Sequence, residues 1–518
     1  MSMRCMQFFA LIGAALSVGL TSADRVPSQV DSQDWFAQGQ QKLAALKQLG
    51  GAGRAKNVIL FVGDGMGVST VTAARILEGQ QKGIDGEGNR LSFEQLPYLA
   101  LSVTASANQQ TPDSAPTATA MVTGIKTNAG ALSVKPTISR NESRADKIAS
   151  AEISTLLEQA EQAGLSTGLV TTTRVTHATP AANYAHIPER NWESDSDLPA
   201  GASVKDIARQ LIETLYGNGP EVVLGGGRQA FYAATTNDPE YPNQVGDRRD
   251  GRNLHEEWLA SSQNAQYIWN AEQLKALDLG QTEKLLGLFE PSHMHYAVDR
   301  EKDQAGEPTL AQMTEAAIAV LRQNPKGFYL MVEAGRIDHA HHTGNAYRAL
   351  NETIALSEAV ETALSNTDPN DTMIVVTADH SHVFTIAGYP SRGNPILGLV
   401  DKDDGYALDK QGLPYTTLGY ANGPGHIGLG ERNAYDDESG WYKKIGQTDG
   451  ARTKLTEKET THPDYLQEAT IPMMMETHAG EDVAIYAGGP GAALFRGVLE
   501  QHMIYHIIAD ALDLSGEQ

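Results

Sequence analysis

Carboxylates, histidines and a threonine follow short apolar segments at four places in this chain. These places are Val58 to Val62 before Asp64, Leu169 to Thr171 before His177 and Thr179, Tyr329 to Val332 before Glu333 and Asp338, and Met373 to Val376 before Asp379 and His380. In open α/β sheets, ligands bind outside the carboxyl ends of the strands, so four such strands would bring these groups into one polar pocket. The pattern predicts an enzyme with several metal ions.

Five residues have the types and positions of metal ligands. Asp338 and His342 are four residues apart, so on a helix both would lie on one face, as two ligands of a zinc ion can. By itself such a pair is more often a solvated helix face. Asp379 and His380 directly follow an apolar strand, where neither type has a role in a core. His478 follows a long polar stretch and precedes another apolar strand, which makes it a candidate third ligand.

Ser114 is the candidate nucleophile, and it precedes a run of Ala and Thr that should form a helix. A serine at this place usually caps the helix. The same place offers free backbone N–H groups and the positive end of the helix dipole to a phosphate. Because no histidine lies near Ser114 in sequence to act as a base, a metal ion would have to lower the pKa of its hydroxyl. The residues alone leave the capping and the catalytic interpretations open.

Strands and helices alternate from about residue 57 to about residue 390. This rhythm predicts an α/β fold with a large, mostly parallel central sheet and helices on both faces. Two polar stretches interrupt it, and the second is predicted to be a small inserted subdomain at about 391–466. The helices are expected at Gln33 to Leu49, Ala115 to Val122, Ile148 to Ala163, Thr309 to Gln323, Asn345 to Leu364 and Val498 to Leu514.

The first 23 residues have the pattern of a cleaved signal peptide. One basic residue, Arg4, precedes an apolar run from Phe8 to Leu20, and small residues follow. The alternative is an ordinary N-terminal core helix, which the shortness of the run disfavours. We expect the mature protein, residues 24–518, to be exported to the periplasm or secreted. The only cysteine, Cys5, lies within the signal, so no disulfide is expected in the mature chain.

The chain is acidic, with a formal net charge of −24 at pH 7. Removal of residues 1–23 takes away one positive charge, Arg4, and no negative one, which gives −25. Such a charge argues against binding to nucleic acid, because nothing would neutralise the phosphate backbone. It fits either a protein that works in high salt or simply a soluble acidic protein.

Six ordered motifs resemble the alkaline phosphatase family. They are Val62-Gly-Asp-Gly-Met-Gly, Asp113-Ser-Ala-Pro-Thr-Ala-Thr-Ala, His177-Ala-Thr-Pro-Ala, Glu333-Ala-Gly-Arg-Ile-Asp-His, Thr377-Ala-Asp-His-Ser-His and Thr477-His-Ala-Gly-Glu-Asp-Val. The resemblance runs from about Asn57 to the C-terminal helix. It implies a phosphomonoester hydrolase that works at alkaline pH and releases inorganic phosphate.

The resemblance also implies two zinc ions, one magnesium ion and a phosphoserine intermediate. In that scheme Ser114 is the nucleophile, and Arg190, oriented by Asp113, grips the phosphate with its planar guanidinium. The implied metal ligands are Asp338, His342 and His478 for one zinc, Asp64, Asp379 and His380 for the other, and Asp64, Thr179 and Glu333 for magnesium.

Several features resemble the animal enzymes of the family more than the enteric bacterial ones. His177 and His339 stand where the enteric enzymes have Asp and Lys, which implies that they lie just outside the magnesium and phosphate ligands. A calcium ion is implied at Glu240, Glu290, Glu307 and the backbone carbonyl of Phe289. The animal enzymes end in a hydrophobic tail that directs a lipid anchor, whereas this sequence ends with Asp513-Leu-Ser-Gly-Glu-Gln, so we expect no membrane anchor.

The inserted subdomain resembles the crown that packs at the dimer interface of this family. Tyr406, Tyr415 and Tyr420 lie in this poorly periodic stretch and are expected to face a partner subunit, so a homodimer is predicted. The competing functions are a phosphodiesterase, a sulfatase and an exported phosphate-binding protein. Sulfatases modify a Cys or Ser, diesterases generally use Thr as the nucleophile, and a binding protein would need no metal.

Overall fold

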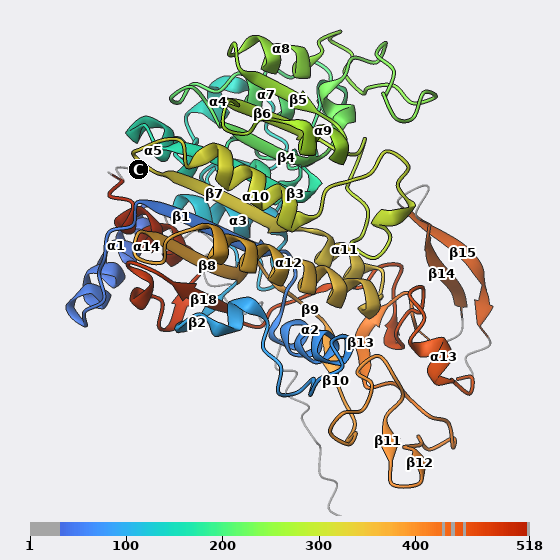
Figure 1. The fold of residues 1–518 in the computed structure, drawn as a ribbon. Coiled ribbons are helices and arrows are strands. Elements are labelled where there is room, and N and C mark those ends of the chain that lie inside the picture. Colours follow the sequence, from blue (N-terminus) through green and yellow to red (C-terminus); the bar gives the residue numbers. More distant parts are fainter. Residues whose placement is uncertain (1–31, 427–429, 437–440, 449–451, 515–518) are drawn as a thin grey trace, which may run out of the picture.

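The centre of the molecule is one large twisted sheet (Figure 1). The computed structural model describes residues 32–426, 430–436, 441–448 and 452–514. Ten strands form the sheet, in the order β19 (Gly497–Glu500), β2 (Tyr98–Val103), β18 (Val483–Gly488), β8 (Thr372–Ala378), β1 (Asn57–Gly63), β7 (Phe328–Ala334), β3 (Ser166–Arg174), β4 (Val222–Gly226), β6 (Lys284–Leu288) and β5 (Ala265–Ile268). From β8 to β5 all neighbours are parallel, whereas β18 is antiparallel to both of its neighbours. The mostly parallel sheet predicted from the sequence is confirmed.

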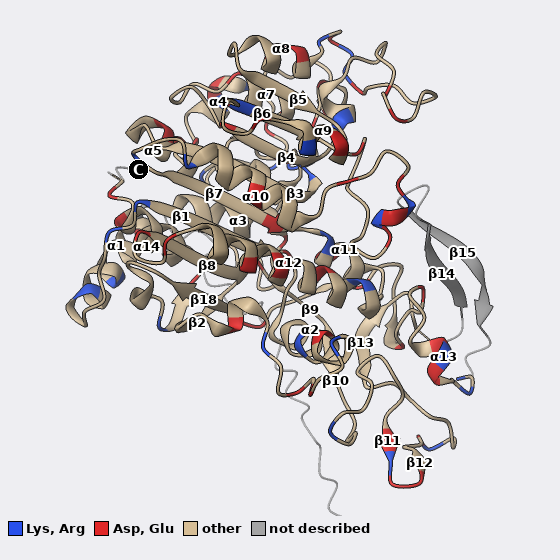
Figure 2. Ribbon diagram, viewed as in Figure 1, with Lys and Arg blue, Asp and Glu red and all other residues tan. Residues whose placement is uncertain are grey.

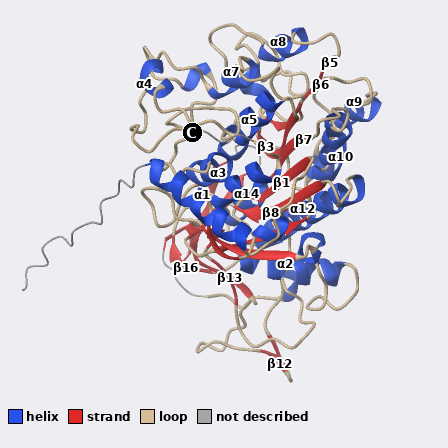
Figure 3. Cartoon of the chain, turned by 90° about the vertical axis from the view of Figure 1, so that its left-hand side faces the viewer, coloured by secondary structure: helices blue, strands red, loops and turns tan. Residues whose placement is uncertain are grey.

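Helices cover both faces of the sheet (Figure 3). The helices are α1 (Ser32–Gln48), α2 (Val68–Gln81), α3 (Ser114–Thr123), α4 (Ala145–Ala149), α5 (Leu156–Ala163), α6 (Ala178–Ala181), α7 (Ile207–Ile212), α8 (Leu254–Ala260), α9 (Ala271–Ala276), α10 (Leu310–Leu321), α11 (Arg336–His342), α12 (Ala346–Asn366), α13 (Glu457–Thr460) and α14 (Met503–Ala511). Alternate side chains of β1 enter two separate cores. Leu60 packs with α3, α5 and α14 on one face, and Phe61 packs with α2, α10 and α12 on the other. Burial on both faces explains the unbroken apolar sequence of this strand.

The four strands that precede the candidate site residues are neighbours in the sheet. Their order is β8, β1, β7 and β3, and all four run in the same direction. In the register of these strands, Val62 lies opposite Thr377 of β8 and Glu333 of β7, and Glu333 lies opposite Thr171 of β3. The strands therefore end at the same level, and the residues that follow them meet at one edge of the sheet.

Two of the expected helices differ from the prediction. The helix expected over Ile148 to Ala163 is two helices, α4 and α5, because Thr155 and Glu158 form a capping box that starts α5. The expected C-terminal helix begins later than predicted, at Met503. The apolar residues before it belong to β19, which pairs with β2 in parallel. Helical periodicity could not reveal that these residues complete the sheet.

In and beside the stretch predicted to be inserted, at about 391–466, the described residues form short strands. β10 (Phe384–Ile386), which precedes this stretch, β13 (Leu418–Gly423) and β16 (Ala469–Pro472), which follows it, form a small sheet. β11 (Asp401–Lys402) and β12 (Gly405–Tyr406) form one hairpin, and β14 (Gly430–Asp436) and β15 (Trp441–Thr448) form another. Of the three tyrosines expected at a subunit interface, Tyr406 is exposed and Tyr415 is partly buried. The expectation for Tyr420 is wrong, because its side chain is buried in the same chain against His341 and Phe384.

Acidic residues are spread over the molecule. Figure 2 shows Asp and Glu on α12, α13 and the loops around β11 and β12, interspersed with Lys and Arg. The predicted signal peptide lies outside the described residues. Among the helices that the structure describes, none has both the length and the hydropathy needed to cross a membrane.

Two buried histidines in the region of the C-terminal helix make the stability of the folded state depend on pH. Burial lowers the pKa of His506 to about 4 and that of His502 to about 3. His506 lies between α14 and α1, where its Nδ1 is 3.2 Å from Nε2 of Gln40. Because the unfolded chain accepts these protons near its ordinary pKa of about 6.5, the folded state loses stability as the pH falls below that value toward 4.

We therefore expect His506→Gln to flatten the acid side of the stability profile. Between about pH 7.5 and about pH 5, His506 alone should lower the free energy of unfolding by about 2 kcal/mol. Urea denaturation at the two pH values should show a smaller decrease in the variant by that amount. His462→Gln is the control, since that side chain is 60% exposed. Equal pH dependence in the wild type and His506→Gln would contradict the expectation.

Candidate active site

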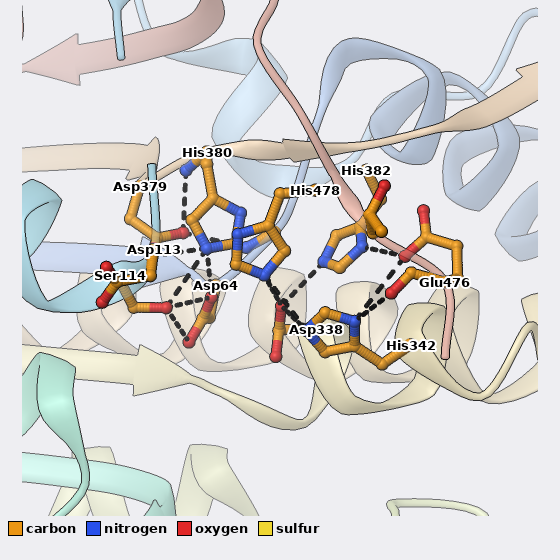
Figure 4. Close-up of polar contacts among 12 residues, drawn as sticks. Asp64, Asp113, Ser114, Asp338, His342, Asp379, His380, His382, Glu476 and His478 are labelled. Carbon is orange, nitrogen blue, oxygen red and sulfur yellow. Dashed lines mark hydrogen bonds and ion pairs between the residues drawn. The ribbon is translucent and has the colours of Figure 1, made fainter. Parts of the chain in front are cut away.

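Asp338, His342 and His478 come together at the carboxyl edge of the sheet (Figure 4). Asp338 and His342 lie on α11, and His478 lies on β17 (His478–Ala479). Oδ1 of Asp338 is 3.3 Å from Nε2 of His342 and 3.2 Å from Nε2 of His478, and the two Nε2 atoms are 3.0 Å apart. Ligand atoms about 2.1 Å from one zinc ion are separated by roughly 3.0 to 3.4 Å. The three atoms thus have the spacing of a zinc site.

The protonation of these histidines also suits a cation. Nδ1 of His342 donates to the carbonyl of Glu476 at 2.6 Å, and Nδ1 of His478 donates to the carbonyl of Pro112 at 2.8 Å. Burial lowers the pKa of His342 to about 4, so its Nε2 carries a lone pair at neutral pH. In the neutral form of His478, its Nε2 is also an acceptor, directed at the same point as the Asp338 carboxylate. Three acceptors so close together repel one another unless a cation lies between them.

His382 is a fourth member of this group, to which the sequence analysis assigned no role. It lies on β9 (Ser381–His382), opposite His478 of β17, and its Nε2 is 2.8 Å from Oδ1 of Asp338. Its Nδ1 is 2.5 Å from a carboxylate oxygen of Glu476, and these contacts raise the pKa of His382 to about 10 despite its burial. A side chain on Gly65 would collide with this ring, 2.4 Å from its Nε2. The i, i+2 spacing of His380 and His382 was the available signal.

Asp64, Asp379 and His380 form a second group around the Ser114 hydroxyl. All three are fully buried. Nε2 of His380 is 3.4 Å from Oδ1 of Asp64 and 3.2 Å from Oδ2 of Asp379. Oγ of Ser114 is 3.3 Å from Asp64 and 3.1 Å from Nε2 of His380. The candidate nucleophile is thus beside the candidate ligands of a second ion.

Helix α3 begins at Ser114, and Asp113 is its N-cap. Oδ1 of Asp113 accepts from the backbone N–H of Ala115 at 3.1 Å, so the capping role belongs to Asp113 and leaves the Ser114 hydroxyl for other contacts. The other oxygen, Oδ2, accepts from Gly130 at 2.9 Å. Arg190 donates to Oδ1 of Asp113 at 3.2 Å and to Nε2 of His177 at 2.9 Å. Asp113 therefore joins the start of α3 to Arg190.

Glu333, Thr179 and His177 form a third group next to Asp64. One oxygen of Glu333 accepts from Thr171 and from Thr173, both on β3, and its other oxygen is buried with no hydrogen-bond partner. The hydroxyl of Thr179 and Nδ1 of His177 are also buried without a partner. Burial raises the pKa of Glu333 to about 7. Unpartnered buried oxygens next to a carboxylate fit a hard cation such as magnesium.

His339 contacts His177 and a third imidazole, His293, that the sequence analysis did not identify. The ring of His293 is 4.4 Å from that of His339 and 5.3 Å from that of His177, edge on in both cases. Burial, together with nearby Arg side chains, lowers the pKa of all three histidines well below the ordinary value. His293 is held by Arg174, which itself bonds to a glutamate. No spacing rule links residues so far apart in the chain.

Burial, and after it the neighbouring carboxylates, disfavours the charged forms of Asp64 and Asp379. Burial raises the pKa of Asp64 well above its ordinary value, with further contributions from Asp379 and Asp338. Burial raises the pKa of Asp379 as well. Asp338 differs: although burial opposes ionisation, the charge of His342 and a hydrogen bond from His382 lower its pKa well below the ordinary value. A cation bound between Asp64 and Asp379 would favour their charged forms.

The residues expected to bind calcium lie apart from this site, in two overlapping groups. Glu240, Glu290 and Asp303 form one group, and Glu290, His295 and Glu307 form the other. The resemblance implied Glu240, Phe289, Glu290 and Glu307, and the structure places His295 and Asp303 beside them. Burial raises the pKa of Glu290 to about 10 and that of Glu240 to about 7. Buried Arg228 pairs with Glu240 at 2.8 Å.

Comparisons with known proteins show the family of the chain. Residues 55–514 match the family described as alkaline phosphatase. The chain is 43% identical to the tissue-nonspecific alkaline phosphatase of Gallus gallus, over 95% of this chain and 92% of that relative. It is also 43% identical to an alkaline phosphatase of Gadus morhua, over 92% and 96% of the two chains. The crystal structure of the Thermus thermophilus alkaline phosphatase superposes with a TM-score of 0.63 at 24% identity, over 90% and 94% of the two chains, and has the same fold.

The contact between His382 and Asp338 leads to a prediction about metal affinity. If His382 orients Asp338 rather than binding the ion itself, His382→Gln should weaken zinc binding by about 10- to 100-fold. Competition with a chromophoric zinc chelator measures this change, with the exposed His462→Gln as the control. Unchanged zinc affinity would show that the contact has no such role, and complete loss of one zinc would make His382 a ligand.

Proposed function

Because the chain belongs to the alkaline phosphatase family and is therefore a metal-dependent phosphomonoester hydrolase, we propose that Ser114 is its nucleophile and that it works through a phosphoserine at alkaline pH. The observation that carries this proposal is the position of the Ser114 hydroxyl, 3.1 to 3.4 Å from His380 and Asp64 at the start of α3. Both of these neighbours are candidate metal ligands.

The residues present fit two zinc ions and one magnesium ion. The acceptors that converge at Asp338 suit zinc, which prefers nitrogen and carboxylate ligands in close tetrahedral spacing. The unpartnered oxygens of Thr179 and Glu333 suit magnesium, which prefers oxygen. When bound, such ions would lower the pKa of the attacking hydroxyl and neutralise charge on the phosphate and the leaving oxygen. The proposed ligands are Asp338, His342 and His478 for one zinc, Asp64, Asp379 and His380 for the second, and Asp64, Thr179 and Glu333 for magnesium.

The residues of the chain then perform the transfer in two steps. The oxygen of Ser114 forms a bond to phosphorus while the bond from phosphorus to the leaving alcohol oxygen breaks, which gives phosphoserine and the alcohol. Water then attacks phosphorus, the bond to Ser114 breaks, and inorganic phosphate is released. Arg190, anchored by Asp113, is positioned to hold two phosphate oxygens with parallel hydrogen bonds. The start of α3 adds backbone N–H groups and the positive end of the helix dipole.

His177 acts from outside the ligands of magnesium in this scheme. Since Arg190 can only donate, Nε2 of His177 accepts that hydrogen bond and the proton of the neutral ring lies on Nδ1. A protonated Nδ1 cannot bind a cation, but it can donate to a ligand of one. We propose that His339 also lies just outside the ligands of magnesium. Its Nδ1 is 3.0 Å from Nη1 of Arg336.

Two further proposals follow from the resemblance. We propose a calcium ion at Glu240, Glu290, Glu307 and the Phe289 carbonyl, and loss of one bound calcium in Glu290→Ala would test it. We propose that residues 1–23 are removed on export to the periplasm or the medium. N-terminal sequencing of exported protein should begin after Ala23, and an intact N-terminus would contradict cleavage.

We also propose a homodimer with its interface on the inserted subdomain. Tyr406 and Leu408 of the inserted stretch are 44% and 58% exposed, and Ile471, Met473, Met474 and Met475, which follow the stretch in the chain, expose 41 to 69% of their surface. Exposed apolar side chains of this kind are typical of a protein interface. Sedimentation equilibrium at micromolar concentration should give twice the mass of one chain, and Met474→Glu should shift the equilibrium toward the monomer. A monomeric wild type would contradict the proposal.

The nucleophile is tested by Ser114→Ala. Because the variant lacks the oxygen that receives the phosphoryl group, turnover of a phosphate monoester should fall by at least about a thousand-fold, or ~4 kcal/mol of barrier. Zinc content should stay unchanged. The control is Ser150→Ala, which removes an exposed serine hydroxyl far along the chain from α3. Turnover close to that of the wild type would exclude Ser114 as the nucleophile.

A further inference from the structure

Three pairs of an arginine and a histidine lie next to the group proposed to bind magnesium. In each pair a guanidinium nitrogen contacts a ring nitrogen, and the pairs are Arg190 with His177, Arg336 with His339 and Arg174 with His293. Because a guanidinium group can only donate, the ring nitrogen accepts in every pair. The proposed transfer uses Arg190 to hold phosphate, and it gives no role to the pair of Arg174 and His293.

The rings of the three histidines pack edge to face. The ring of His293 is centred 4.4 Å from that of His339 and 5.3 Å from that of His177, at interplanar angles of 72° and 83°. The third distance, between the rings of His177 and His339, is 5.5 Å. Nε2 of His177 accepts from Arg190, and its Nδ1 is buried with no hydrogen-bond partner among the described residues. Since edge-to-face contacts are directional, the two neighbouring rings hold the His177 ring in its plane.

Arg174 holds His293 in place. Both ring nitrogens face this one residue: Nε2 contacts Nη1, and Nδ1 lies 3.3 Å from the backbone nitrogen. The guanidinium also donates to Oγ of Ser292 at 3.3 Å. The loop after β6 can approach β4 so closely because Gly226 has no side chain, since a Cβ atom there would lie 2.1 Å from the carbonyl oxygen of Ser292. This loop therefore presents His293 directly to Arg174 at the end of β3.

Arg174 is itself fixed by an ion pair with two hydrogen bonds. Its Nε and Nη2 donate to the two oxygens of Glu193 at 2.7 and 2.6 Å, and Thr176 donates to the same carboxylate at 2.5 Å. The side chains of Arg174 and Glu193 are 27% and 15% exposed. Arg174 is also the last residue of β3, where it pairs with Gly226 of β4. The sheet and Glu193 together therefore fix the position of the Arg174 guanidinium.

These contacts lead from the sheet to the arginine that is proposed to bind phosphate. Arg190 has two acceptors, Oδ1 of Asp113 at 3.2 Å and Nε2 of His177 at 2.9 Å. Two acceptors define the plane of the guanidinium, whereas with Asp113 alone it could rotate about that one contact. Two phosphate oxygens can be held by parallel hydrogen bonds only when the guanidinium is correctly oriented. A His177 ring that lost its orientation would therefore weaken the binding of phosphate.

We propose that Arg174 and His293 are positioning residues, which hold the guanidinium of Arg190 in its phosphate-binding orientation through the ring of His177. Neither residue touches phosphate in this scheme, and neither binds a metal ion. The inference rests on the proposed role of Arg190 as a phosphate ligand, and it does not depend on which residue is the nucleophile.

The experiment measures the inhibition constant of inorganic phosphate, together with KM and kcat for a phosphate monoester, in the full enzyme loaded with zinc and magnesium. His293→Ala should raise the inhibition constant and KM by about 10-fold, because even a small misplacement of a binding group is costly. The value of kcat should change by less than about twofold, since an interaction lost equally from the bound substrate and the transition state raises KM alone.

A double variant separates positioning from a purely structural role. Arg190→Ala should raise the inhibition constant more than His293→Ala does, and His293→Ala should add nothing to it, because His293 acts only through Arg190. Arg174→Lys keeps the positive charge without the planar fork, so it should behave as His293→Ala does. His255→Ala is the matched control, which should leave the constants unchanged. It removes another partly exposed imidazole that packs against two rings, those of Tyr232 and Tyr267.

Two results would overturn this inference alone. One is normal phosphate inhibition in His293→Ala and Arg174→Lys beside weakened inhibition in Arg190→Ala, and the other is an additive effect in the double variant. If Arg190→Ala itself leaves phosphate inhibition unchanged, the proposed role of Arg190 fails and this inference fails with it. Should His293→Ala not fold, Arg174→Lys decides the question, since it alters only a partly exposed side chain.

Discussion

Lone pairs that face one another in a buried pocket coexist only when positive charge lies between them. In this protein the constraint is strongest at Asp338, His342 and His478, whose acceptor atoms are 3.0 to 3.3 Å apart. In both histidines Nδ1 donates its proton to a backbone carbonyl, so Nε2 is the nitrogen that remains to bind a cation. The same need for cations recurs at Asp64, Asp379 and Glu333. The fold can be understood as the framework that holds these groups together against their mutual repulsion.

That framework is the edge of a parallel sheet with a core on each face. Four adjacent strands end at the same level, and each is buried on both sides, so their ends cannot move independently. Because a closely packed interior has low compressibility, the ends of these strands stay in place, and the residues that follow them keep fixed positions. A shell of supporting contacts does the remaining work: Thr171 and Thr173 hold Glu333, and Glu476 holds His382. The burial of the apolar strands therefore offsets the free-energy cost of holding the polar groups in place, and the polar groups themselves do not.

The sequence was most informative where a residue type is out of place. Carboxylates and histidines directly after apolar strands have no structural reason to be there, and Asp64, Glu333, Asp379 and His380 could be recognised for that reason. Contacts between side chains from segments far apart in the chain could not be predicted from the sequence. Glu476 and His382 are 94 residues apart and meet only through the register of β9 with β17. Tyr420 was misjudged for a related reason, since its partner His341 belongs to another element. The capping box of Thr155 and Glu158 is a sequence signal for the start of α5. The helical spacing of apolar residues continues across this point, so the prediction joined the two segments into one helix.

The order of the site along the chain has a consequence for biogenesis. Asp64 and Ser114 are made early, whereas His478 is on β17, which pairs with β9 only near the end of the chain. A nascent chain that has emerged as far as α12 holds several of the carboxylates but neither Asp379, His380 nor the last imidazole. An ion that bound then would meet an incomplete ligand set and little selectivity. The site can therefore discriminate between metal ions only after the last strands have been translated. The compartment in which the complete chain folds then determines which ions are available to it.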